Sequence, residues 1–156
     1  MYETRWATEE EISLLADYWY RMACEMGECD GIPKPDLQRA EEVKHLFSKE
    51  YKSGNLSFRV AVDNEDNIVA CAGGLVRTEY SFPLAPEQSL YGWVISVYTL
   101  KEHRKNGLAH KLVDEICSWL QQKGAKRARL WASSAGRTVY EHLGFQNMTD
   151  MTKTLS

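Results

Sequence analysis

Apolar and polar residues alternate with two different periods along the chain, and each change of period marks a predicted element. Residues 2–7 alternate as a short strand does, and residues 12–26 carry apolar side chains at helical spacing. A break rich in Gly and Pro, residues 27–35, separates this helix from a second one over residues 36–54. The pattern therefore predicts a strand followed by two amphipathic helices.

The middle of the chain has the short-period, β-branched pattern of strands. Leu56–Val62 and Ile68–Val76 predict a hairpin, and Tyr91–Tyr98 predicts a central strand. A loop containing two prolines, Thr78–Leu90, is expected before that strand. The glycine pair at 73–74 indicates a bulge or close backbone packing.

The last third of the chain alternates between helices and strands. Helices are predicted over residues 108–123 and 133–143, and strands over residues 127–132 and 149–155. The whole order is β-α-α-β-β-β-α-β-α-β, which predicts an α/β fold around one mixed sheet. We expect residues 1–156 to form a single domain.

Composition and charge narrow the classes of function. A net charge of −3 argues against bulk attraction to nucleic acid, and no apolar run is long enough to cross a membrane. The N-terminus lacks the basic and apolar regions of a secretory signal. The four cysteines have no metal-ligand spacing, so no metal site is expected, and reduced thiols fit a cytoplasmic location.

The stretch 93–109 carries the first chemical signal. An apolar strand runs into a short basic turn containing Gly107, and an amphipathic helix follows at once. The first turn of a helix has free backbone N–H groups, and the helix dipole favours negative charge there. Arg104 and Lys105 add positive charge, and glycine lets the backbone approach a ligand closely. The turn is therefore predicted to hold a phosphate-bearing ligand.

Two segments of the chain resemble motifs of the GNAT superfamily, the general-control-related N-acetyltransferases. The turn, residues 104–109 (RKNGLA), is similar to the family's acyl-CoA motif [RQ]-x-x-G-x-[GA]. Residues 133–145 (SSAGRTVYEHLGF) resemble the family's N-x-x-A-x-x-x-Y-x-x-x-G-F segment. The chain departs from the pattern at Lys101, where many members have proline, and at Ser133, where many have asparagine. The resemblance implies a mostly antiparallel sheet flanked by four helices.

The resemblance also implies that acetyl-CoA is the co-substrate. Its pyrophosphate is expected on the backbone N–H groups of residues 104–109, and its pantetheine arm along residues 97–99, where family members open the sheet through a β-bulge. The residues expected to bind acetyl-CoA are Val97, Tyr98, Thr99, Arg104, Lys105, Asn106, Gly107, Leu108, Ala109, Ser133 and Arg137.

By the same resemblance, the backbone N–H of Val97 is the expected oxyanion donor, and Tyr140 is the expected general acid that protonates the leaving thiolate. Family members often use a carboxylate as general base, and Glu25, Glu28 and Glu79 remain as alternatives. No Ser/His/Asp spacing indicates a covalent intermediate, so direct attack in a ternary complex is expected.

The acceptor is expected to be a primary amine of a small molecule, entering between the first two helices and the loop 78–90. One alternative keeps the chemistry and replaces the acceptor by a protein N-terminus or a lysine. Another is a non-catalytic acyl-CoA sensor, which would need no acid at Tyr140. A homodimer stays open as an alternative to the monomer.

Overall fold

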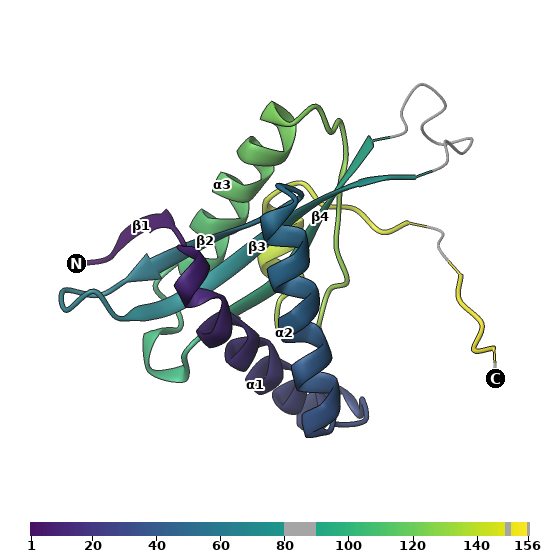
Figure 1. Cartoon of the computed structure of the whole chain (residues 1–156), viewed down its shortest axis with the longest axis horizontal. Coiled ribbons are helices and arrows are strands. Elements are labelled where there is room, and N and C mark those ends of the chain that lie inside the picture. Colours follow the sequence, from purple (N-terminus) through teal and green to yellow (C-terminus); the bar gives the residue numbers. More distant parts are fainter. Residues whose placement is uncertain (80–89, 149–150, 156) are drawn as a thin grey trace.

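The computed structural model describes residues 1–79, 90–148 and 151–155 (Figure 1). The helices and strands are β1 (Glu3–Trp6), α1 (Ile12–Asp30), α2 (Leu37–Lys52), β2 (Leu56–Val62), β3 (Ile68–Thr78), β4 (Leu90–Thr99), α3 (Leu108–Gln122), β5 (Ala128–Arg129) and α4 (Arg137–His142). Two short 3-10 turns, η1 (Glu9–Glu11) and η2 (Lys101–His103), precede α1 and follow β4.

The strands form one sheet in the order β1-β2-β3-β4-β5. β1 to β4 pair antiparallel, and β5 runs parallel to β4. α1 and α2 pack on one face of the sheet and α3 on the other (Figure 1). The prediction of a mixed, mostly antiparallel sheet flanked by four helices is confirmed.

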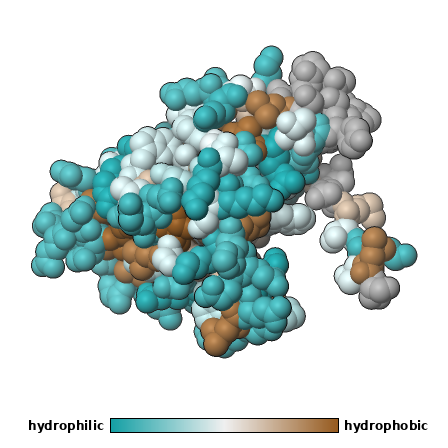
Figure 2. Space-filling view, in the orientation of Figure 1, coloured by the Kyte–Doolittle hydropathy of each residue, from teal (hydrophilic) through white to brown (hydrophobic). Residues whose placement is uncertain are grey.

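Each face of the sheet has its own apolar core. Phe58 and Val60 contribute to the cluster under α1 and α2, while Ala61 contributes to the cluster under α3. The outer sides of α1 and α2 are mainly hydrophilic (Figure 2). Among the described residues, no helix is both long enough and apolar enough to span a bilayer.

Glycines in the sheet bring α3 close to the strands. A Cβ at Gly74 would lie 2.9 Å from Ile116 Cγ2, and one at Gly92 would lie 2.8 Å from Leu120 Cδ1. A side chain at either glycine would have to displace these α3 side chains, so the close packing predicted for the 73–74 pair is confirmed. The contact places α3 directly over β3 and β4, with its N-terminus just beyond the end of β4 (Figure 1).

The first helix is longer than predicted. It continues through Gly27 to Asp30 and ends at Gly31, whose φ is +69°. The predicted break at Gly27 was wrong, because this glycine serves close packing inside the helix. A Cβ at Gly27 would lie 2.7 Å from the carbonyl oxygen of Ile32, so only glycine allows the following segment to fold back there.

The strands after α3 are shorter than predicted. Of the expected 127–132 strand, Ala128–Arg129 form β5 beside β4, and the Arg127 carbonyl accepts a hydrogen bond from the Gly92 N–H of β4 at 3.0 Å. The last predicted strand is wrong for residues 151–155, which form no strand; residues 149 and 150 lie outside the described residues. Met151 is 93% exposed and Leu155 is 86% exposed, so neither apolar side chain packs against the sheet.

Candidate active site

A β-bulge interrupts β4 near its end. Cys71 pairs with Tyr98 and Gly73 pairs with Ile95, so three steps on β4 oppose two on β3. The extra residue reverses the alternation of side chains. Ile95 packs in the core under α1, Val97 packs under α3, and Tyr98 returns to the α1 side. Without the bulge, Tyr98 would face α3.

Ser96 occupies the bulge in an unusual conformation. Its φ is +53°, in the left-handed region that costs a non-glycine residue about 1–2 kcal/mol. The residue is buried, and its hydroxyl has no hydrogen-bond partner among the described residues. Its carbonyl accepts a hydrogen bond from the Cys71 thiol at 3.3 Å. The surrounding strands therefore hold a strained, polar residue where the sheet opens.

The sheet opens on the other side of β4 as well. β5 pairs with β4 only at Gly92 and Trp93, in the part of the chain that the structure describes. Ser96 and Val97 also lack a Cα partner in the β3 register. The end of β4 is thus flanked by irregular pairing on one side and by the early departure of β5 on the other. This is the opening that the family resemblance predicts for a pantetheine arm.

The turn between β4 and α3 presents backbone to solvent. Lys105 has a φ of +66° and Gly107 a φ of +73°, and residues in this region turn successive N–H groups toward one side. Among the described residues, no side chain caps the N-terminus of α3 at Gly107, and apart from its chain neighbours no described atom lies within 4 Å of the position of its Cβ. Asn106 braces the turn, because its side-chain amide donates to the carbonyls of His103 and Arg104 at 3.0 and 3.3 Å.

The Arg104 side chain turns away from the helix N-terminus and reaches α1. Its Nε donates to the Thr99 carbonyl and its NH2 group donates to Glu25 Oε1, both at 2.9 Å. Its guanidinium carbon lies 5.5 Å from the centre of the Tyr98 ring. Arg104 therefore joins the turn to α1 and to the end of β4.

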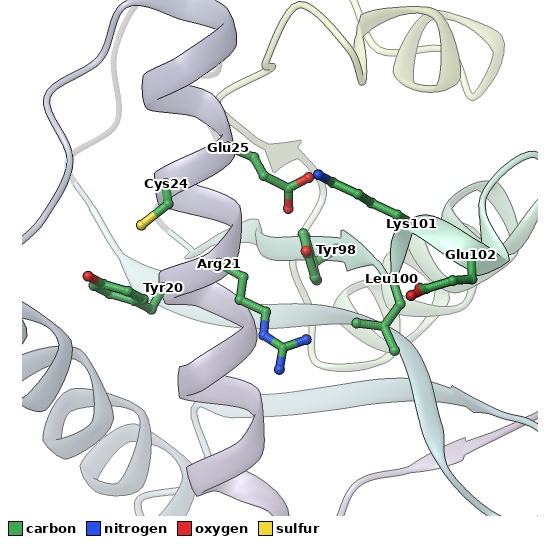
Figure 3. Close-up of a pocket in the computed structure, with 8 residues that line it drawn as sticks. All are labelled: Tyr20, Arg21, Cys24, Glu25, Tyr98, Leu100, Lys101 and Glu102. Carbon is green, nitrogen blue, oxygen red and sulfur yellow. The ribbon is translucent and has the colours of Figure 1, made fainter.

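A pocket of about 390 Å³ lies between α1 and the corner formed by β4 and η2 (Figure 3). Its lining residues are Tyr20, Arg21, Cys24, Glu25, Tyr98, Leu100, Lys101 and Glu102. Figure 3 shows Arg21 and Glu25 extending from α1 on the side of Tyr98, with Lys101 reaching back from η2 toward Glu25. The pocket lies on the sheet face to which the bulge turns Tyr98.

Glu25 is held in its charged form. Burial raises the pKa of this carboxyl, but the Tyr98 hydroxyl and the Arg104 guanidinium outweigh burial and hold the pKa below its usual value. Burial, followed by the Glu25 carboxylate, raises the pKa of Tyr98 to about 12. At neutral pH the pocket therefore contains a carboxylate beside a protonated phenol.

The other two carboxylates considered as general bases lie outside the pocket lining. Glu28 is exposed, and its Oε1 lies 3.5 Å from Lys34 Nζ. Glu79 accepts hydrogen bonds from the Trp93 indole at 2.8 Å and from Arg129 at 3.0 Å. Of the three candidates, Glu25 alone lines the pocket.

Tyr140 lies on the α3 side of the sheet. It is 9% exposed and belongs to the same core as Val97, and its ring lies against Gly136 and 6.0 Å from the ring of Phe145. Burial raises the pKa of its phenol, so the group is protonated at neutral pH. No described residue hydrogen-bonds to the hydroxyl, which leaves it available to a ligand.

The remaining predicted contacts lie around the start of α4 and in the first turn of α3. Ser133 Oγ accepts a hydrogen bond from the Gly136 N–H at 3.2 Å, and Arg137 donates to Asn147 at 2.8 Å. Leu108 is buried and Ala109 half-buried at the start of α3, so only their backbone is suited to a ligand there. Among the described residues, no group of His, Cys, Asp and Glu side chains could hold a metal ion.

The donor half of the site fits acetyl-CoA. The uncapped N-terminus of α3 and the two left-handed residues suit a pyrophosphate, and the opened end of β4 suits an amide-rich arm. The model of the acetyltransferase (GNAT) family matches residues 13–145. The chain belongs to this family. It is an acetyl-CoA-dependent N-acetyltransferase, as the two motifs predicted.

Solved structures share the fold of this acetyltransferase. A predicted acetyltransferase from Clostridium acetobutylicum, solved with acetyl-CoA, is 23% identical, with a TM-score of 0.87 over 99% of this chain and 96% of its own. A GCN5-related N-acetyltransferase from Ralstonia eutropha JMP134 is 19% identical, with a TM-score of 0.86 over 99% of both chains. Glucosamine-6-phosphate N-acetyltransferase from Arabidopsis thaliana is 15% identical, with a TM-score of 0.66 over 99% of this chain and 98% of its own. No curated protein matches the chain.

Sequence reasoning missed several pocket residues of the acetyltransferase. Tyr20, Arg21 and Lys101 line the pocket, yet none was expected to contact a substrate. Arg21 and Glu25 are four residues apart on one helix, a spacing that places both on one face and could have pointed to Arg21. The loop 78–90, beside which the acceptor was expected to enter, is described only at residues 78, 79 and 90.

Proposed function

We propose that the acetyltransferase transfers the acetyl group to a primary amine of a small molecule, by direct attack in a ternary complex. The observation that carries the proposal is the pocket beside the β4 bulge, in which Glu25 is a charged carboxylate. A space of about 390 Å³ suits a small organic amine. The alternatives of a protein acceptor and of a non-catalytic sensor have no comparable observation in their favour.

In this proposal the protein acts on both partners of the reaction. Glu25 accepts the proton that the amine loses, directly or through a water molecule, as the amine nitrogen forms a bond to the acetyl carbon. The backbone N–H of Val97 stabilises the negative charge that develops on the carbonyl oxygen. Tyr140 donates its proton to the sulfur as the carbon–sulfur bond breaks. Acetyl-CoA supplies the activated acetyl thioester.

An acceptor screen tests this function. The purified protein is incubated with acetyl-CoA and a panel of small primary amines, and thiol release is measured beside the mass of each product. We expect thiol release that depends on the amine and a product heavier by one acetyl group. Acetylation of peptides and lysine side chains in preference to every small amine would contradict the proposal. Binding of acetyl-CoA with no transfer to either class would favour the sensor.

Two further parts of the proposal concern the domain organisation of the enzyme and its location in the cell. We propose that residues 1–156 act as one catalytic domain, which is supported by a family match that spans 13–145. We also propose a cytoplasmic location, which is supported by the free state of all the cysteines: Cys24, Cys29, Cys71 and Cys117.

A further inference from the structure

Some charged side chains of the pocket already form an ion pair within the protein, and others do not. Glu25 is bound by Arg104, and Lys101 adds a further favourable charge that lowers its pKa. Arg21 contacts the Tyr18 ring, with 5.5 Å between its guanidinium carbon and the ring centre, and forms no ion pair with a described residue. Lys101 likewise forms no ion pair within the described part of the chain. The pocket therefore offers two cations that no carboxylate neutralises by contact.

The balance of charge around the pocket also favours an anionic ligand. The lining has two cations, Arg21 and Lys101, and two anions, Glu25 and Glu102, so it carries no net charge by itself. Because Arg104 pairs with Glu25, Glu102 alone is left to balance Arg21 and Lys101. A low-dielectric wall such as Tyr98 and Leu100 strengthens the field of these charges. These cations repel the second or third ammonium group of a polyamine.

The positions of Arg21 and Glu25 along α1 also set the distance between the two groups of a ligand that could bind them. They stand four residues apart on α1, one turn of the helix, which corresponds to a rise of about 6 Å. Both extend from α1 on the side of the pocket (Figure 3). An acceptor that places its amine at Glu25 can therefore place a second group, a few bonds away, beside Arg21.

We propose that the acceptor carries an anionic group, a carboxylate in the first instance, and that Arg21 and Lys101 bind it while the amine lies at Glu25. This inference rests on the proposed function and specifies its substrate class: amino acids and similar anionic amines, and not polyamines. Arginine suits a carboxylate because its guanidinium donates two parallel hydrogen bonds. Arg21 and Lys101 then determine specificity and take no part in the proton transfers.

Matched acceptors test the proposal. Free amino acids are compared with their carboxamides and with 1,4-diaminobutane at one pH, and kcat/KM is calculated in each case for the concentration of unprotonated amine. We expect kcat/KM for the free acid to exceed that for its carboxamide by at least 10-fold. Equal rates for acid and carboxamide, or a preference for the diamine, would overturn the inference while leaving the amine acetyltransferase function intact. No transfer to any amine would count against the proposed function itself.

Substitutions at Arg21 and at a control arginine distinguish a loss of anion binding from a general loss of activity. Arg21→Gln is expected to raise KM for the acid by about 10-fold or more, with little change in kcat and no change for the carboxamide. Arg39→Gln is the matched control, because Arg39 is an exposed arginine on α2 that pairs only with Glu42 in the described part of the chain. Equal losses for acid and carboxamide in Arg21→Gln would show a structural role and contradict the proposal.

A binding measurement needs no turnover. Calorimetry with N-acetyl amino acids, the expected products, is carried out with coenzyme A present. The unaltered protein should bind them, and Arg21→Gln and Lys101→Gln should bind them at least 10-fold more weakly. An unaltered protein that binds N-acetyl amino acid amides as tightly as the free acids would overturn the proposal whatever the activity.

Discussion

Gly107 offers the sharpest test of the phosphate-binding turn. Replacing it with alanine puts a methyl group at a φ of +73°, a conformation that costs an L-residue about 1–2 kcal/mol. No described residue beyond the two chain neighbours lies within 4 Å of the methyl group, so this strain is the whole expected loss of folding stability. The methyl instead occupies the open space beside the N-terminus of α3. Losing one charge-assisted hydrogen bond there, worth about 1.5–3 kcal/mol, should weaken coenzyme A binding roughly 10- to 100-fold.

Gly54→Ala is a matched control for this change. Gly54 has a φ of +83° and lies after α2, away from the pocket. Its Cβ position, like that of Gly107, has no described atom within 4 Å beyond the chain neighbours. Thermal unfolding should show similar losses for both variants, while calorimetric titration with coenzyme A should separate them. S-acetylpantetheine, which lacks the pyrophosphate, should bind both variants alike. The reasoning fails if Gly107→Ala binds coenzyme A as tightly as Gly54→Ala does.

Three other substitutions have defined outcomes. Tyr140→Phe should lower kcat about 100-fold and leave acetyl-CoA affinity nearly intact; unchanged turnover, with chemistry rate-limiting, would remove Tyr140 from the mechanism. Glu25→Gln should lower kcat/KM for the amine at least 10-fold, whereas the exposed Glu41→Gln should not, and equal activity of the two in a steady-state assay would exclude Glu25 as the base. Hydrogen bonding by Arg5 lowers the pKa of Glu11 to about 2, so its contribution to stability is complete above the usual carboxyl pKa and is lost as pH falls toward 2. Because both side chains are partly exposed, denaturation of Glu11→Gln at neutral pH and at pH 3 should show a difference from the unaltered protein of only about 1 kcal/mol, smaller at the lower pH.

The donor half of the site could be predicted because its parts are contiguous. A strand end, a turn and a helix N-terminus within residues 93–109 bring their backbone groups together whatever the rest of the chain does. The left-handed conformation of Gly107 follows from its residue type, since glycine adopts it without strain. Hydrophobic periodicity and turn residues, which are also local signals, predicted most of the helices and strands to within a few residues of their observed ends.

The acceptor half could not be predicted in the same way, because it depends on register. One extra residue at Ser96 turns Tyr98 from the α3 side to the α1 side. The family resemblance predicts a bulge in this region, but a buried serine in a β-branched run does not indicate its position or which side chains it turns. The pocket then joins Arg21 to Lys101, which lie 80 residues apart in the sequence. Their meeting depends on how α1 packs across β4, which is a property of the folded chain and not of either segment.

Arg104 connects the two halves and changes the interpretation of the basic turn. The sequence predicted that the positive charge of Arg104 would lie beside the phosphate. In the structure its guanidinium instead donates hydrogen bonds to Glu25 and to the Thr99 carbonyl. In the proposed phosphate site the anion would therefore be bound mainly by the backbone N–H groups of the turn, and Gly107 would matter more than side-chain charge. By holding Glu25 in its charged form beside the end of β4, Arg104 links the position of the turn to the position of the proposed base.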